Sequence, residues 1–268
     1  MDELKQEVLD FWNEDSCGER LLLSATDKTG YQKQMEKRYS LEPFIEGFAR
    51  FADSRDLDVL EIGVGLGADH QRFAQAGARL AGIDLTERAV EHTRRRFDLF
   101  GLSSDLRVGD AESLQYPEAA FDVVYSWGVL HHSPDTRCAI NEVWRVLRHG
   151  GVARIMIYHK HSLVGYMLWL RYAMLAGKPW RSLSDIYAHH LESPGTKAYT
   201  MGEARTLFNK FSDVRISTML THGDLLESAA GQRHRSLLLS MAKLIWPRAL
   251  LRFLMPKRGL FMLIEARK

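Results

Sequence analysis

Paired cysteines are absent from this chain, and their absence excludes two classes of protein. The two cysteines, Cys17 and Cys138, stand far apart and form no CxxC arrangement. A small secreted domain held by disulfides needs several cysteines, and a thiolate zinc site needs them at close spacing. We therefore expect neither a disulfide scaffold nor a zinc site of that kind.

The sequence also lacks a long apolar run. The longest extends from Leu163 to Leu170 and stops at Arg171, far short of the ~20 residues that a membrane span requires. The start of the chain carries too many charges for a secretory signal. Together with the scarcity of cysteine, these features predict a soluble, cytoplasmic protein in a reducing compartment.

Excess charge of one sign is missing as well. The net charge of +2 gives no whole-chain argument for nucleic-acid binding. The charge is uneven, because residues 1–20 hold seven acids and two bases whereas residues 231–268 hold nine bases and one acid. We interpret both stretches as solvated helix faces. The 46% of hydrophobic residues supports a sizeable core, and 268 residues fit one large domain or one domain with a cap.

Strand and helix patterns alternate regularly from Leu57 onward. Strands alternating with helices of ten to fifteen residues are typical of a parallel sheet with crossover helices. The pair Gly150-Gly151 is expected to end one helix and release the chain into the next strand. The predicted strands lie near 57–62, 79–84, 105–108, 121–126 and 150–158, and the predicted helices near 66–76, 86–100 and 135–147.

The residues before the first strand are expected to form a lid. Residues 1–56 form this N-terminal helical segment, with an amphipathic helix over 3–12 and a polar loop over 13–30. Pro43 suits the first turn of a helix that runs to about Asp53.

Residues 57–268 are predicted to form the main domain, interrupted by cap insertions at about 160–200 and 222–258. The first insertion begins with an apolar helix at about 162–176. The second contains a basic amphipathic helix at 236–254, for which we expect packing as a cap or in a homodimer rather than contact with a membrane surface. Between and after the insertions the core resumes, with a helix near 201–211, a strand near 213–220 and a last strand over 260–267, the two strands forming an antiparallel edge hairpin.

A glycine-rich loop follows the first predicted strand. An apolar run ends in Glu61, and Gly63, Gly65 and Gly67 alternate before a helix. Glycines at this spacing let the backbone turn sharply and approach a ligand closely. The pattern GxGxG is neither the GxGxxG of dinucleotide sites nor a P-loop, which needs Lys and Ser or Thr. An acid at the floor of the site disfavours pyrophosphate and suits a cationic ligand.

Polar residues follow the next strands where a ligand would lie. Asp84 ends the second strand, 17 positions after Gly67, as expected for an acid that binds ribose hydroxyls. Asp110 follows the third strand, where a carboxylate can accept a hydrogen bond from a purine amine. The fourth strand ends in Ser126 and leads to His131-His132 at the same edge of the sheet.

At these residues the sequence resembles the class I S-adenosylmethionine-dependent methyltransferases. The resemblance rests on Glu61 to Gly67, Asp84, Asp110-Ala111, the block from Phe121 to Ser126, and Arg145-Val146-Leu147-Arg148-His149-Gly150-Gly151. It implies an α/β, Rossmann-like, seven-stranded and mostly parallel sheet with its last strand antiparallel, here with helical cap insertions. S-adenosylmethionine is the implied cofactor. The residues expected to bind it are Arg38, Glu61, Gly63, Gly65, Gly67, Asp84, Leu85, Asp110, Ala111 and Ser126.

Methyl transfer from a sulfonium is an in-line displacement, so the protein must mainly align donor and acceptor and exclude water. A base is needed only when the acceptor is protonated. The catalytic candidates are His131, Tyr158 and His159, which follow the fourth and fifth strands. A role in loop packing stays open for His132. No metal site is expected, because His159 and His161 have no carboxylate nearby in sequence.

The leading hypothesis is therefore a methyltransferase acting on the O, N, S or C centre of a small molecule with an apolar or aromatic part. Three alternatives stay open. One is another reaction of the same cofactor, namely aminocarboxypropyl transfer or cyclisation. A nucleic-acid methyltransferase is supported only by the basic end of the chain, and the Asn/Asp-Pro-Pro-aromatic block of amino-methyltransferases is absent at Ser126 to Val129. The third is a module that binds the cofactor without chemistry.

Overall fold

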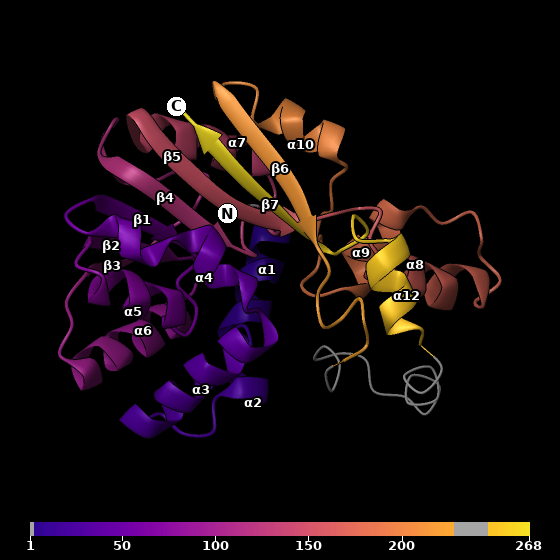
Figure 1. Cartoon of the computed structure of the whole chain (residues 1–268), viewed down its shortest axis with the longest axis horizontal. Coiled ribbons are helices and arrows are strands. Elements are labelled where there is room, and N and C mark those ends of the chain that lie inside the picture. The colour runs from indigo at the N-terminus through magenta and orange to yellow at the C-terminus, as the bar shows by residue number, and fades with distance from the viewer. Residues whose placement is uncertain (1–2, 228–245) are drawn as a thin grey trace.

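A central sheet organises the computed structural model, which describes residues 3–227 and 246–268 (Figure 1). Seven strands of the described chain form one sheet in the order β3-β2-β1-β4-β5-β7-β6. The strands are β1 (Asp58–Ile62), β2 (Arg79–Asp84), β3 (Asp105–Val108), β4 (Phe121–Trp127), β5 (Leu147–Tyr158), β6 (Asp213–Met219) and β7 (Phe261–Arg267).

Strand direction matches the predicted architecture. Strands β1 to β5 pair in parallel, whereas β7 lies between β5 and β6 and is antiparallel to both. Parallel strands place their carboxyl ends at one edge, so the loops after β1, β2, β3, β4 and β5 meet there. The Rossmann-like fold with an antiparallel last strand is confirmed.

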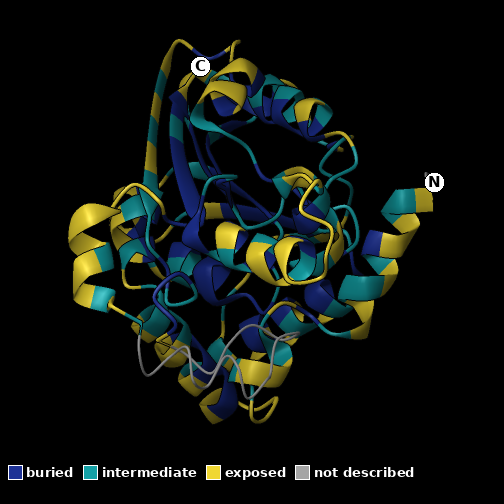
Figure 2. Cartoon of the chain, turned by 90° about the vertical axis from the view of Figure 1, so that its right-hand side faces the viewer, coloured by how far each residue is buried: buried dark blue, intermediate teal, exposed yellow. Residues whose placement is uncertain are grey.

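Helices cover both faces of the sheet, as Figure 1 shows. Residues alternate between the faces along each buried strand. Leu60 and Val124 pack in the core cluster that includes Ile140 of α7, whereas Val59 and Tyr125 pack with α4, η1, α5 and α6 on the other face. Figure 2 shows the central strands mostly buried and the outer sides of the helices exposed. The edge strands β3 and β6 contain only exposed and half-buried residues. The helices between the strands are α5 (Ala68–Gln75), α6 (Glu87–Phe100), α7 (Thr136–Val146) and α10 (Met201–Leu207).

The N-terminal segment contains more helix than the sequence indicated. Helix α1 is as expected, but the stretch 13–30 is not a plain loop. Asp27 caps the start of α3 by accepting a hydrogen bond from the Gly30 amide. The apolar periodicity that would reveal α3 is absent, because its buried residues include Gly30 and Gln34. The elements are α1 (Glu3–Glu14), α2 (Glu19–Leu22), α3 (Lys28–Leu41), α4 (Phe44–Ala49) and the 3₁₀ turn η1 (Phe51–Ser54).

Two predicted boundaries are wrong for local backbone reasons. The helix after Pro43 ends at Ala49, because Arg50 takes a left-handed conformation with φ 51° before η1. The fifth strand begins at Leu147 rather than at the glycine pair. Gly150, with φ 79°, lies in an irregularity where the pairing with β4 skips from Leu147 to Val152.

The cap helices gather beyond the carboxyl end of β5. They are α8 (Leu163–Trp169), the π-helical turn η2 (Leu170–Met174), α9 (Leu183–His190) and α12 (Arg248–Leu254). Most of the predicted basic helix at 236–254 lies outside the described residues. Within the described ranges, no helix has both the length and the apolarity needed to cross a bilayer.

Candidate active site

A cavity of about 510 Å³ opens at the carboxyl edge of the sheet. Its wall runs from the loop after β1 to the cap helix α8 and includes residues of α1 and α3. A cavity of this size is in the range that holds small organic ligands. The cavity therefore joins the predicted cofactor loop, the lid and the cap around one space.

The glycine loop adopts the backbone that its sequence predicted. Gly63, Gly65 and Gly67 have φ of 85°, 51° and 73°, in the left-handed region that favours glycine. A Cβ on Gly63 would lie 2.1 Å from Cγ2 of Val129, whereas a Cβ on Gly65 would meet no atom within 4 Å. The loop thus packs tightly on the side of β4 and leaves the backbone at Gly65 open to a ligand.

Asp84 is oriented by backbone amides at the end of β2. One carboxylate oxygen accepts from the Gly65 amide at 3.1 Å, and the other accepts from the amide and hydroxyl of Thr86 at 3.0 and 2.9 Å. Burial raises the pKa of this carboxyl group, although these donors favour the charged form. Asp84 and its neighbour Leu85 both line the cavity, and their predicted contact with a ribose stays a prediction.

Asp110 lies beneath the N-terminal helix. The Lys5 ammonium of α1 donates to Asp110 at 2.6 Å and to Glu112 at 2.5 Å. The Glu112 amide also donates to Asp110, at 2.9 Å. Lys5, Asp110 and Ala111 line the cavity together, so α1 closes over the predicted adenine position.

Glu61 lies at the floor of the cavity and contacts a buried histidine. Its carboxyl group is 2.8 Å from Nδ1 of His70, whose Nε2 is 2.8 Å from the Ser104 hydroxyl. Burial raises the pKa of Glu61 well above its usual value and lowers that of His70 to about 3. The pair is therefore neutral as a whole and fixes the end of β1 against α5.

Arg38 reaches the cavity but has an internal partner. Its guanidinium binds both carboxylate oxygens of Asp69, at 3.2 and 2.8 Å. The hydroxyls of Tyr39 and Tyr125 donate to the same carboxylate, each within 2.9 Å. Arg38 and Asp69 therefore form a charge pair beside the glycine loop, and the predicted contact of Arg38 with the cofactor stays a prediction.

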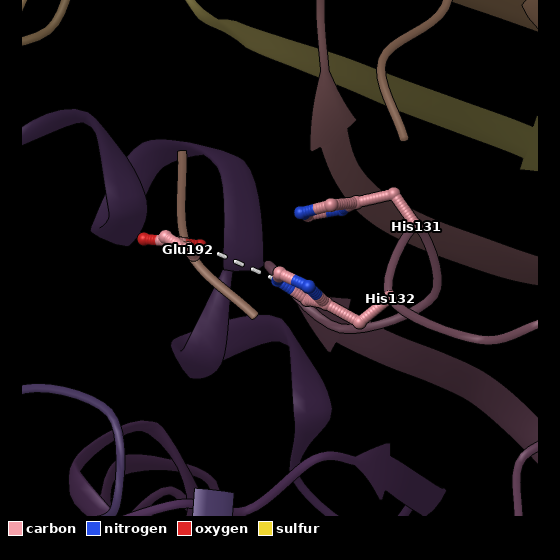
Figure 3. Close-up of side chains that lie close together, drawn as sticks. All are labelled: His131, His132 and Glu192. Atoms are coloured by element: carbon pink, nitrogen blue, oxygen red, sulfur yellow. Dashed lines mark ion pairs between the residues drawn. The ribbon is translucent and has the colours of Figure 1, made fainter. Parts of the chain in front are cut away.

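His132, Tyr158 and Glu192 form a polar cluster on the cavity wall. The Tyr158 hydroxyl donates to Glu192 at 2.7 Å, and Nε2 of His132 faces the same carboxylate at 3.4 Å. Nδ1 of His132 is 2.8 Å from the Ser193 hydroxyl. Figure 3 shows the rings of His131 and His132 directed toward Glu192. Burial raises the pKa of the Tyr158 phenol well above its usual value.

The rest of this end of the cavity is mainly apolar. Met167 and Leu168 come from the cap helix α8, and Phe11 and Trp12 come from α1. Trp127 at the end of β4 completes an aromatic wall. This end of the cavity therefore offers apolar and aromatic surface beside the polar cluster.

Three predicted site residues are not among those that line the cavity. The Ser126 hydroxyl donates to the Ile62 carbonyl at 2.9 Å and so joins β4 to β1. His131 is buried with its ring centroid 4.0 Å from that of Tyr158. His159 has Nδ1 3.2 Å from the Gly259 carbonyl. Of the catalytic candidates, only Tyr158 faces the space where a ligand would lie.

Sequence reasoning missed two acids that the fold brings to the cavity. Glu192 comes from the first insertion, where no motif or periodicity marks it. Asp69 follows the glycine loop, and its position beside Arg38 depends on α3, which the sequence did not reveal. Glu42, which lies in the predicted lid segment, is half-buried on the cavity wall, and desolvation with repulsion from Asp69 and Glu192 raises its pKa to about 7.

Comparison with known proteins finds relatives of the central part of the chain. Residues 60–155 match the model of a family described as a methyltransferase domain. A probable S-adenosylmethionine-dependent methyltransferase of Mycolicibacterium smegmatis is 38% identical over 95 residues, 35% of each chain. The 27-O-demethylrifamycin SV methyltransferase of Amycolatopsis mediterranei is 40% identical over 98 residues, again 35% of each chain.

A structural match extends over the whole chain. Phosphoethanolamine N-methyltransferase 2 of Haemonchus contortus superposes with a TM-score of 0.63 at 15% identity, over 100% of this chain and 60% of that one. Residues 60–155 thus resemble a methyltransferase domain, and the glycine loop and the strand order agree with that resemblance, whereas the solved structure supports the fold. The matched stretch spans about a third of the length of the two curated relatives.

Proposed function

We propose that this protein transfers a methyl group from S-adenosylmethionine to a small, largely apolar acceptor. The observation that carries the proposal is the single cavity that joins the glycine loop and Asp84 to the Tyr158 wall. Donor and acceptor bound in one enclosed space can be held in line, which is most of what this displacement requires. When bound, the cofactor supplies a methyl group already activated by its positively charged sulfur.

Residues of the glycine loop and the strand ends bind the donor in this proposal. Gly65 lets the backbone approach it, Asp84 accepts from the ribose hydroxyls, and Asp110 accepts from the adenine amine. Glu61 at the floor of the cavity and the nearby Arg38–Asp69 pair would surround the amino-acid end. The fit is supported by the open space at Gly65 and by the orientation that two backbone amides give Asp84.

The acceptor lies between the aromatic wall and the polar cluster. Trp12 and Trp127 cover its apolar part, and its reacting atom faces Tyr158 and Nε2 of His132. When that atom carries a proton, His132 and Glu192 are the cavity groups placed to receive it. His131 supports this wall through its contacts with both neighbours. We assign no contact with the acceptor to His159.

The relatives act on different atoms by their names, which include an O-methyltransferase and a sarcosine/dimethylglycine N-methyltransferase. The acceptor atom is therefore left open among O, N, S and C. Mass spectrometry of the product separates methyl transfer from aminocarboxypropyl transfer and from cyclisation, because each changes the acceptor's mass by a different amount.

Asp84→Ala tests the donor site. Loss of the acceptor for two ribose hydroxyls should weaken binding of S-adenosylhomocysteine by about 2 kcal/mol, or roughly 30-fold. Asp98→Ala, the same change on the exposed surface of α6, should leave the dissociation constant unchanged. Calorimetric titration of both variants and the wild type provides the comparison. Equal affinity of all three proteins would remove Asp84 from the site.

A further inference from the structure

The buried ring of His131 has no hydrogen-bond partner within the described chain at either nitrogen. The residue is fully buried. A buried polar group without a partner loses its hydrogen bonds to water and gains none in return, so such groups are rare and call for a ligand, a water or an ion. The nitrogens of this ring lie beside the cavity wall rather than in the apolar core, because the ring contacts those of His132 and Tyr158.

Two further ligand atoms converge on the same place. One nitrogen of His131, one nitrogen of His132 and one oxygen of Glu192 all lie within 4.8 Å of one another. Tetrahedral zinc bonded at 2.0–2.2 Å holds its ligand atoms about 3.4 Å apart. Small side-chain rotations would close this difference, and Figure 3 shows the three groups already directed toward a common point.

The groups that hydrogen-bond to these side chains are arranged as in a metal site, where neighbouring residues orient the ligands. A ligating histidine typically uses its other nitrogen to bind an oxygen, which fixes its orientation. Nδ1 of His132 is 2.8 Å from Ser193 Oγ, which leaves Nε2 for a ligand. The Tyr158 hydroxyl similarly orients Glu192, at 2.7 Å.

We propose that His131, His132 and Glu192 bind one divalent transition metal ion, with zinc the best match to two imidazoles and a carboxylate. Three protein ligands leave a fourth position, as in catalytic rather than structural zinc sites. Because His132 and Glu192 line the cavity, this position faces the acceptor space. The metal would bind an acceptor hydroxyl or thiol, lower the pKa of that group so that its proton passes to solvent, and leave a second lone pair free to attack the methyl group. In the metal-bound protein His132 and Glu192 would be ligands instead of proton acceptors. The inference rests on the proposed function for this role but not for the metal binding itself.

Co²⁺ is a suitable probe, because its tetrahedral complexes absorb visible light. Protein stripped of metal with a chelator should bind one equivalent of Co²⁺, develop this absorption and lose it on addition of Zn²⁺. Glu192→Gln and His132→Gln should each weaken binding at least about tenfold. His189→Gln, on the exposed surface of α9, is the matched control and should bind like the wild type.

Absence of the absorption from the wild type would overturn the proposal, as would equal Co²⁺ affinity in the wild type and both ligand variants. Binding of S-adenosylhomocysteine and the unfolding temperature, measured on the same samples, show that each variant is folded. A wild type that binds the nucleoside but no metal would reject the metal site and leave the donor site standing.

Discussion

At the scale of single residues, Gly63 and Gly47 present opposite situations for a side chain. Gly63 has φ 85°, and an added Cβ would overlap Val129. Gly47 lies in α4, where an added Cβ would meet no atom within 4 Å. The fold of the glycine loop therefore requires a residue without a side chain at position 63. Helix α4 has no such requirement at Gly47.

Gly63→Ala should lower the free energy of unfolding by about 2 kcal/mol or more, since it combines a left-handed backbone with overlap. It should also weaken binding of S-adenosylhomocysteine. Gly47→Ala should raise stability by up to about 1 kcal/mol, the gain in helix propensity. Denaturant unfolding of both variants checks the pair. Equal stability of the two would show that the loop adapts to a side chain.

Glu42 gives the stability of the protein a pH dependence with a defined sign. Its pKa is raised from 4.5 to about 7 in the folded protein. Between these values the folded state holds a proton that the unfolded state has released, so the contribution of Glu42 to stability falls as the pH rises.

Glu42→Gln keeps the shape of the protonated side chain and removes this titration. The wild type should therefore lose stability relative to the variant between pH 4.5 and pH 7, by up to roughly 3 kcal/mol. Unfolding by denaturant at several pH values gives the difference between the two proteins. A difference that stays constant across this range would contradict the raised pKa.

At the scale of elements, the Lys5 side chain ties α1 to the loop after β3, over the predicted adenine position. Lys5 is half-buried and binds Asp110 and Glu112 on the loop after β3. Lys5→Met should keep the stem of the side chain and lose both ion pairs, which are worth about 1 kcal/mol at this partly exposed position. Amide hydrogen exchange in α1 should then accelerate about fivefold.

Lys33→Met on the exposed surface of α3 makes the same chemical change and should leave exchange in α1 unchanged. Added S-adenosylhomocysteine should slow exchange in α1 of the wild type, because the helix lines the cavity. Exchange in α1 that is the same in the wild type and in Lys5→Met would show that the ion pairs do not hold the helix.

The elements differ in how well local sequence predicts them. The strands β1 and β4 are buried on both sides, so continuous apolar runs reveal them. Helix α3 buries the side chain of Gln34. The buried guanidinium of Arg96 donates hydrogen bonds to this side chain and to the backbone carbonyls of Tyr31 and Leu66. A helix held by such polar contacts leaves no apolar stripe, and sequence reasoning placed the start of α3 in a loop.

At the scale of the whole molecule, the sequence could predict that the residues proposed to bind the donor lie together, because most of them follow one another in order at strand ends and line one cavity. The acceptor half of the site could not be predicted in this way. Glu192 and His132 are brought together by the packing of an insertion on β4 and β5, and no local pattern records that packing. For the same reason the sequence marked His159 as a candidate but missed the acids that face the cavity.

The structure of a complex with S-adenosylhomocysteine tests most directly whether one cavity aligns donor and acceptor. The ribose hydroxyls should bind Asp84, the adenine should lie by Asp110 under α1, and the sulfur should face the space between Tyr158 and Trp127. A ligand with its ribose away from Asp84, or with its sulfur turned from that space, would contradict the proposed alignment.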